Sequence, residues 1–152
     1  MSVLITSTPF DPEAAHLDFR KSAGNVGAIT AFTGLVRGDR DIVLSLSHYA
    51  GMTETEITKI GEAAAARWPI TSWRIIHRVG DLQAGEPIVF VAAASAHRRA
   101  SFEAADFLMD YLKSEAPFWK QETHNHTSQW IEPRAQDKDD IARWQKPIKQ
   151  KD

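Results

Sequence analysis

Two lysines stand on either side of a proline in the last third of the chain. Lys113 lies in the final turn of a helix expected over residues 98–115, Pro117 ends that helix, and Lys120 follows three residues later. On an unbroken helix this spacing would separate the two side chains by about 10 Å along one face. Because the proline turns the chain, the ammonium groups could approach each other, and their repulsion would lower the pKa of at least one. A neutral amine can act as an acid or base, although the spacing alone leaves open whether the two lysines meet.

Other basic residues stand where predicted elements begin or end. Arg37 closes a strand, His97 and Arg98 lie between a buried strand and the long helix, and Arg134 follows the last predicted strand. A strand-to-helix junction offers free backbone N–H groups and the positive end of the helix dipole, so His97 and Arg98 form a candidate phosphate site. A solvated helix start explains the same two residues equally well. The helix macrodipole alone would favour Lys113 at its position.

Metal chemistry has little support in the sequence. Glu122, His124 and His126 alternate and would share one face of a strand, as metal ligands could. The surrounding segment THNHTS is typical of a loop and supplies no further ligand, so we expect neither a metal nor another cofactor. The chain has no cysteine, which excludes disulfides, thiolate nucleophiles and cysteine-bound metals.

The overall composition narrows the class of protein. The chain has 152 residues, which fits one domain, and a net charge of -2, which disfavours binding to nucleic acid. Its longest apolar run, residues 88–94, is too short to cross a membrane. The first ten residues, MSVLITSTPF, lack the features of a signal peptide. We therefore expect a cytoplasmic protein that binds neither nucleic acid nor membrane.

Strands and helices alternate along the chain. Strands are expected over residues 3–6, 25–36, 42–49, 73–79, 88–94, 118–122 and 130–132, and helices over residues 11–24, 53–68 and 98–115, with a short one around Trp144. Thr53 and Glu56 fit a capping box for the second helix. Residues 25–36 and 42–49 resemble an antiparallel hairpin, and residues 123–128 resemble a loop. This order predicts an α+β fold with mainly antiparallel pairing, with a domain over residues 1–135 and a polar tail over residues 136–152.

Several long strings resemble the large, catalytic subunit of molybdopterin synthase. They are FTGLVR (residues 32–37), HYAGM (48–52), IHRVGDLQAGEPIVFVAAASAHR (76–98), FEAADFLMDYLK (102–113) and APFWKQE (116–122). The resemblance implies an α/β hammerhead-type fold with mainly antiparallel sheets and two main helices. It also implies a sulfurtransferase of molybdenum cofactor biosynthesis. In this family the large subunit is a homodimer, and a small ubiquitin-like subunit binds each half to give a heterotetramer. That partner's C-terminal Gly-Gly thiocarboxylate gives its sulfur to cyclic pyranopterin monophosphate, forming the molybdopterin dithiolene.

The same resemblance implies roles for individual residues. Lys113 and Lys120 match the family's catalytic lysines, one contacting the partner's terminal carbonyl and the other acting as general acid or base, with the two roles exchangeable. The substrate-binding residues would be Leu35, Val36, Arg37, His97, Arg98, Gln121, Glu122 and Arg134, the last from either protomer. Two departures concern loop shape: Ser47 replaces a commonly acidic residue, and residues 123–129 lack a turn glycine.

Two other classes of function fit the residues. A non-catalytic receptor for a ubiquitin-like protein could use the lysines only to grip an acidic tail. A small nucleic-acid binder could use Arg98 and Arg99 at the helix start.

Overall fold

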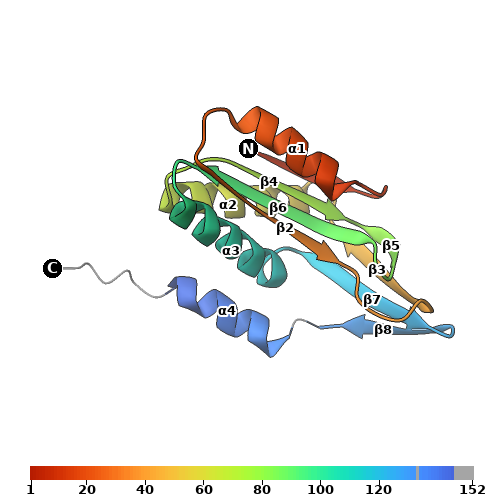
Figure 1. Cartoon of the computed structure of the whole chain (residues 1–152). Coiled ribbons are helices and arrows are strands. Elements are labelled where there is room, and N and C mark those ends of the chain that lie inside the picture. Colours follow the sequence, from red (N-terminus) through yellow and green to blue (C-terminus); the bar gives the residue numbers. More distant parts are fainter. Residues whose placement is uncertain (133, 146–152) are drawn as a thin grey trace.

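The structure, a computed structural model, describes residues 1–132 and 134–145 (Figure 1). Eight strands and four helices follow one another in this part of the chain: β1 (Ser2–Thr6), α1 (Pro12–Ala23), β2 (Ala28–Leu35), β3 (Ile42–His48), α2 (Met52–Arg67), β4 (Ile70–Arg78), β5 (Gly80–Gln83), β6 (Pro87–Ser95), α3 (Arg98–Ser114), β7 (Phe118–His124), β8 (Thr127–Ile131) and α4 (Ala135–Gln145). The strands form two four-stranded sheets, in which only the β1–β4 pair is parallel. The predicted α+β class with mainly antiparallel sheets is confirmed.

The first sheet, called sheet A here, has the strand order β1-β4-β6-β2 and lies between two helical layers (Figure 1). On one face α2 and α3 pack against β4 and β6 around Ile57, Ile75 and Leu108, which are completely buried. On the other face α1 packs Phe19 against Phe90. Because both faces are covered, β6 is apolar along most of its length, as its sequence predicts.

One glycine allows α2 to approach sheet A closely. A Cβ atom at Gly61 would lie 2.1 Å from the ring of Trp73, well inside van der Waals contact. The buried indole of Trp73 therefore occupies the space that any other residue at position 61 would need.

The second sheet, called sheet B here, has the strand order β5-β3-β7-β8. The predicted hairpin of residues 25–36 and 42–49 is wrong, because β2 pairs with β6 in sheet A while β3 pairs with β5 and β7 in sheet B. The physical reason is that β2 matches the buried, apolar β6 along eight residue pairs, from Ala28 opposite Ser95 to Leu35 opposite Pro87. The segment between β2 and β3 is thus a crossover from one sheet to the other.

The start of α2 also differs from its prediction. Gly51 caps the helix, and its N–H donates to the Glu54 carboxylate at 2.6 Å, so the predicted box of Thr53 and Glu56 is wrong. Thr53 lies inside the first turn and is completely buried.

Residues 123–128 form a tight hairpin and not the predicted loop. β7 and β8 pair from Lys120 opposite Ile131 to His124 opposite Thr127. The two turn residues, Asn125 and His126, have φ of 48° and 65°. Positive φ at both central residues is the geometry of a type I′ turn, which usually contains glycine. With His126 in the turn, the described residues contain no group of acidic or histidine side chains that could hold a metal.

The C-terminal helix α4 packs on α3. Ile141 is buried, Trp144 contacts the main core, and Arg143 forms ion pairs with Asp106 and Asp110 at 2.8 and 2.6 Å. The expected tail over residues 136–152 therefore includes this packed helix, and residues 146–152 lie outside the described residues. Among the helices described, none is long and apolar enough to cross a membrane.

Candidate active site

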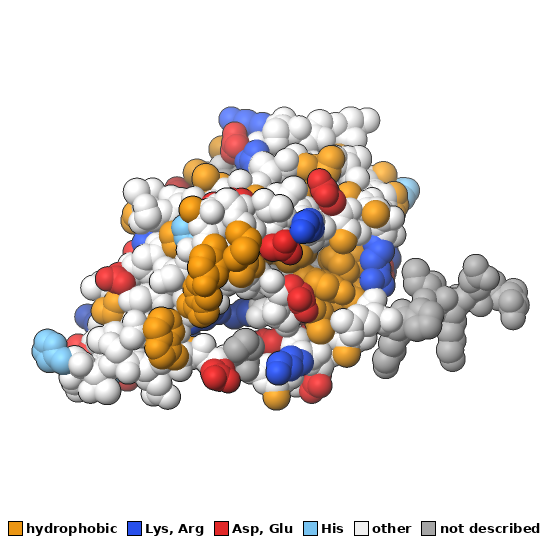
Figure 2. Space-filling model, turned by 180° about the vertical axis from the view of Figure 1, so that it is seen from behind, with side chains coloured by type: hydrophobic (Ala, Val, Ile, Leu, Met, Phe, Trp, Pro, Cys, Tyr) orange, Lys and Arg blue, Asp and Glu red, His pale blue; other side chains and the backbone are white. Residues whose placement is uncertain are grey.

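A cavity of about 410 Å³ lies between the inner face of sheet B and the ends of β2, α3 and the segment before α4. Its walls combine aliphatic side chains with four cationic and two anionic ones, which come from several elements: Leu35, Val36, Arg37, Ile42, Leu44, Ile88, Lys113, Lys120, Glu122, Ile131, Arg134 and Asp137. Figure 2 shows a hollow on the rear of the molecule, with Lys or Arg atoms inside it and hydrophobic side chains beside it. The cavity could therefore hold a molecule with an anionic group and an apolar or aromatic part.

Two consecutive elements bring Lys113 and Lys120 together. The α3 helix ends at Ser114, the chain turns through Pro117, and β7 begins at Phe118. In β7 side chains alternate between faces, so Lys120 and Glu122 both point into the cavity. Lys120 lies opposite Leu46 of β3, which fixes its place along the sheet. The turn that the proline predicted thus places both lysines in one cavity.

Burial and the neighbouring cation lower the pKa of Lys120 to about 8, from an ordinary value of 10.5. Desolvation of the ammonium group is the largest cause, and the positive charge and hydrogen bonding of Lys113 add to it. The Asp137 carboxylate acts in the opposite direction. Lys120 can therefore exchange a proton near neutral pH, as a general acid or base must.

Most of the site residues expected from sequence line this cavity. Leu35, Val36 and Arg37 come from the end of β2, and Glu122 lies two residues after Lys120 on the same face of β7. Arg134 lines the cavity of its own chain. Gln121 does not line the cavity. The alternation of side chains along β7 turns it to the other face of sheet B.

His97 and Arg98 lie elsewhere in the same chain. They border a second cavity of about 450 Å³ at the start of α3, together with Gly27, Ala96 and Arg99. Gly27 directly precedes β2, whereas Leu35, which lines the lysine cavity, is its last residue. The two basic cavities therefore lie at opposite ends of one strand, and a single chain does not bring all the predicted residues together.

The cavity includes five residues that the sequence reasoning missed: Ile42, Leu44, Ile88, Ile131 and Asp137. Alternation in residues 42–49 could have indicated Leu44, which points to the same side as the buried Leu46. Asp137 left no local signal, because it reaches the cavity only through the folding of α4 against α3.

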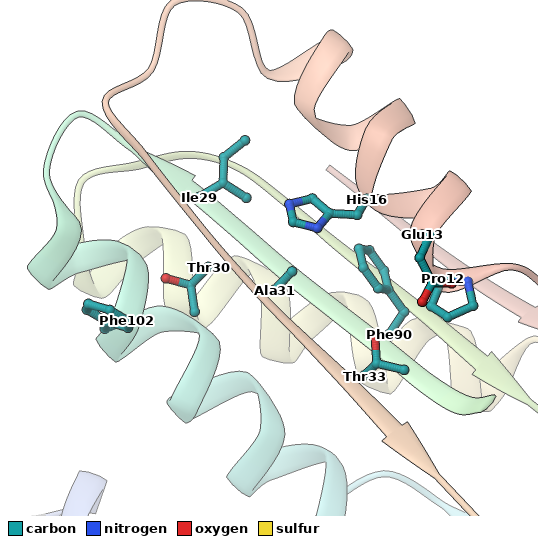
Figure 3. Close-up of a pocket in the computed structure, with 9 residues that line it drawn as sticks. All are labelled: Pro12, Glu13, His16, Ile29, Thr30, Ala31, Thr33, Phe90 and Phe102. Carbon is teal, nitrogen blue, oxygen red and sulfur yellow. The ribbon is translucent and has the colours of Figure 1, made fainter. Parts of the chain in front are cut away.

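A third cavity, of about 430 Å³, runs beside β2 between α1 and α3 (Figure 3). Ile29, Thr30, Ala31 and Thr33 of β2 line it, with Phe102 of α3 on one side. Figure 3 shows His16 and Glu13 reaching toward the strand from α1 on the other side. β2 is one of the two edge strands of sheet A, so this groove follows an edge to which no described strand is paired.

The fold is α+β, and its cavity contains two neighbouring lysines and can accept an anion. These features are typical of a protein that carries out acid–base chemistry on acidic substrates. A family model described as MoaE protein matches residues 5–115, and the chain belongs to this family. Its curated members include catalytic subunits of molybdopterin synthase, an enzyme of molybdenum cofactor biosynthesis. The resemblance found in the sequence is confirmed.

Individual relatives are similar to this chain over nearly its whole length. The molybdopterin synthase catalytic subunit of Caulobacter vibrioides is 45% identical over 146 residues, which cover 95% of this chain and 97% of that protein. The solved molybdopterin biosynthesis MoaE protein of Burkholderia ambifaria MC40-6 has a TM-score of 0.83 and 40% identity, covering 96% of this chain and 99% of its own. A chain from a Helicobacter pylori 26695 complex of subunits 1 and 2 of molybdopterin-converting factor shares the fold. It has a TM-score of 0.76 at 21% identity, covering 87% of this chain and 91% of its own.

Proposed function

We propose that this chain transfers sulfur from the thiocarboxylated C-terminus of a small ubiquitin-like subunit to cyclic pyranopterin monophosphate, forming the molybdopterin dithiolene. The observation that carries the proposal is the pair Lys113 and Lys120 in one cavity, where the pKa of Lys120 falls to about 8. The chain has no cysteine, so its sulfur must come from outside, in agreement with a sulfur-carrying partner.

In this proposal the four cationic groups of the cavity have separate roles. Arg37 and Arg134 would attract the acidic substrate, since guanidinium groups bind phosphate through charge-assisted hydrogen bonds. Lys113 would stabilise the developing oxyanion at the partner's terminal carbonyl, and Lys120 would move a proton at the pterin carbon. Each transfer forms a carbon–sulfur bond on the pterin and breaks a carbon–oxygen bond at the same carbon, whose oxygen leaves as water or stays with the phosphate. Water then cleaves the acyl–sulfur bond, which frees the partner as a carboxylate.

The partner would reach the cavity with its flexible C-terminal tail. Glycine at the last two positions of that tail would let an extended backbone enter between the aliphatic walls of the cavity, because glycine has no side chain. The terminal anion would then meet the lysines. The Helicobacter pylori chain of the same fold was solved in a complex of two subunits, which supports a two-subunit assembly here.

A second copy of this chain would bring His97 and Arg98 to the lysine cavity. An antiparallel pairing of two β2 edges around a two-fold axis would set Ala28 of one copy opposite Leu35 of the other. The start of α3 in one copy would thereby lie near the lysine cavity of its partner. Exposed aromatic residues beside this edge, Phe32 and Phe102, would become buried, which favours the pairing.

Turnover with purified components tests the reaction. The chain, the thiocarboxylated partner and the pterin substrate should yield molybdopterin, whereas a partner without its two terminal glycines should yield none. The truncated partner should still bind in calorimetry with weaker affinity, because its globular surface remains. A non-catalytic receptor would bind the full-length partner and produce nothing, so binding without turnover would refute the proposal.

Subunit complementation tests the shared site. Lys120→Ala and Arg98→Ala homodimers should each be nearly inactive. Mixing them with subunit exchange creates heterodimers in which one of the two sites is intact. Activity should therefore return to about a quarter of the wild-type value at equal mixing. If mixing restores nothing although exchange is verified by mass spectrometry, His97 and Arg98 do not act across the dimer.

A further inference from the structure

The segment between Lys113 and Lys120 is held by two buried side chains from elements that carry no predicted site residue. Thr53, in the first turn of α2, is completely buried, and its hydroxyl donates to the Pro117 carbonyl at 3.2 Å. The same hydroxyl oxygen accepts from the Tyr49 N–H at 3.1 Å. One threonine side chain thus joins the end of β3, the start of α2 and the turn that leads into β7.

The second contact lies one residue further on. His77 of β4, only 7% exposed, stacks on Phe118 with ring centroids 4.0 Å apart and planes at 17°. Its Nδ1 lies 2.8 Å from the Arg78 carbonyl, so the Nδ1–H donates and the ring orientation is fixed. Phe118 begins β7 two residues before Lys120.

We propose that Thr53 and His77 are positioning residues that hold the α3–β7 turn so that Lys113 and Lys120 share one cavity. Pairing with β3 fixes β7 along its length, but that pairing leaves the path from the end of α3 into β7 undetermined. The Thr53 hydrogen bond fixes the turn at Pro117, and the His77 ring fixes the first residue of the strand. Neither side chain lines the lysine cavity, so both act through the lysines.

The protonation of His77 agrees with this role. The pKa of His77 falls to about 4, and burial is the largest cause. Repulsion from Lys120, Lys113 and His48 also lowers it, while the hydrogen bond to Arg78 acts in the opposite direction. At neutral pH the ring is therefore uncharged, and it can stack beside two lysines without adding a third positive charge. A protonated imidazole at this place would repel both.

The protonation of Lys120 depends on all the charged and titratable groups around it. Those groups are Lys113 of α3, Asp137 of α4, His77 of β4, Glu122 of β7, Arg37 after β2, and Arg134. If the turn loosens, Lys120 gains water and moves away from Lys113, the two main causes of its lowered pKa. Its pKa should then rise from about 8 toward the ordinary lysine value.

Three variants and one control test this inference. Thr53→Val keeps the shape of the side chain and removes the hydroxyl, Thr53→Ser keeps the hydroxyl, and His77→Leu removes the stacking ring. Thr58→Val is the control, because the Thr58 hydroxyl donates to the Glu54 carbonyl within α2 and, among the described residues, makes no hydrogen bond to the α3–β7 turn. Labelling of lysine amines at a series of pH values, quantified for Lys120 by mass spectrometry, gives its pKa in each variant without any enzyme assay.

Thr53→Val and His77→Leu should raise the pKa of Lys120, whereas Thr53→Ser and Thr58→Val should leave it near the wild-type value. This inference deepens the proposed function, so kcat should fall by about ten- to a hundredfold in the first two variants, with a smaller change in KM. If Thr53→Val does not fold, His77→Leu decides. Folded variants with an unchanged labelling curve would overturn the positioning role. A wild-type chain without sulfur transfer would refute the proposed function and leave the labelling result valid.

Discussion

The two sheets of this protein have opposite designs. In sheet A the central strand β6 is buried from Val89 to Ser95, and helices cover both faces. In sheet B no residue of β7 or β8 is fully buried, and the inward face of β7 carries Lys120 and Glu122. Hydrophobic burial on both faces stabilises sheet A. Sheet B buries Leu46 and Leu82, but it also accepts partly desolvated charges on β7, which weaken it. Sheet A therefore contains most of the buried apolar residues, whereas the lysine cavity lies against sheet B.

The largest effect should follow from removing a lysine of sheet B's cavity. Lys113→Ala should lower product formation by at least about a hundredfold, because a charge that stabilises the transition state is lost. The fold should persist, as seen by circular dichroism. Lys120→Arg should also have little activity, since a guanidinium group stays charged and cannot move a proton near neutral pH. Lys59→Ala, which removes an exposed lysine of α2, is the control and should remain active. Near wild-type turnover in Lys113→Ala would contradict the catalytic assignment.

Shortening a buried side chain in sheet A should have the opposite effect: stability should fall while activity is kept. Ile75 is completely buried between β4 and the α2–α3 layer, so Ile75→Ala should lower the free energy of unfolding by about 2–5 kcal/mol. The activity of the molecules that remain folded should change little. Denaturant unfolding and an active-site titration measure the two quantities. A large loss of kcat in folded Ile75→Ala protein would show that the sheets are not independent.

Replacing Lys120, which is partly buried, by an apolar residue should stabilise sheet B and abolish activity. Lys120 has a pKa of about 8 in the folded protein and about 10.5 when unfolded, so the unfolded chain binds more protons between these values. The free energy of unfolding should therefore rise with pH from about 8 to about 10.5. Lys120→Met should gain roughly 1–3 kcal/mol at pH 7, after discounting for partial solvation, and the gain should shrink as pH rises through this window. Urea unfolding across that range measures it, and a gain that does not change with pH would contradict the desolvation account.

The smallest effect should come from the hairpin tip of sheet B. His126 adopts a φ of 65°, which glycine tolerates better than histidine. His126→Gly completes an Asn-Gly sequence, the most favourable one for a type I′ turn, and should stabilise the protein by about 0.5–1 kcal/mol. Thermal unfolding would reveal the gain. A loss of stability would mean that the His126 side chain makes a contact worth more than the backbone strain.

Local patterns predicted the elements well. The amphipathic stripe of α3 and the apolar run of β6 each follow from the residues inside the element. Pairing partners were harder, because β2 could match more than one apolar strand and only the packed sheet selects β6. The β7–β8 hairpin was missed because Asn125 and His126 lack the usual glycine.

The site was predictable only where local sequence patterns determine the structure. The proline between Lys113 and Lys120 indicated a turn, and the structure brings both into one cavity. No local signal could show that His97 and Arg98 stand at the far end of β2. Nor could a local pattern reveal Thr53, whose hydroxyl reaches a carbonyl 64 residues away.

The alternation along β7 limits how this protein can change in evolution. Lys120 and Glu122 face the cavity, while Trp119 and Gln121 face the opposite side. An insertion or deletion between Ser114 and Phe118 that shifted the register of β7 by one residue would exchange the two faces and turn Lys120 out of the cavity. A substitution in that connection alters one side chain, whereas a one-residue register shift moves every side chain of β7 to the other face. The number of residues between α3 and β7 is therefore expected to vary less among working homologues than their identity.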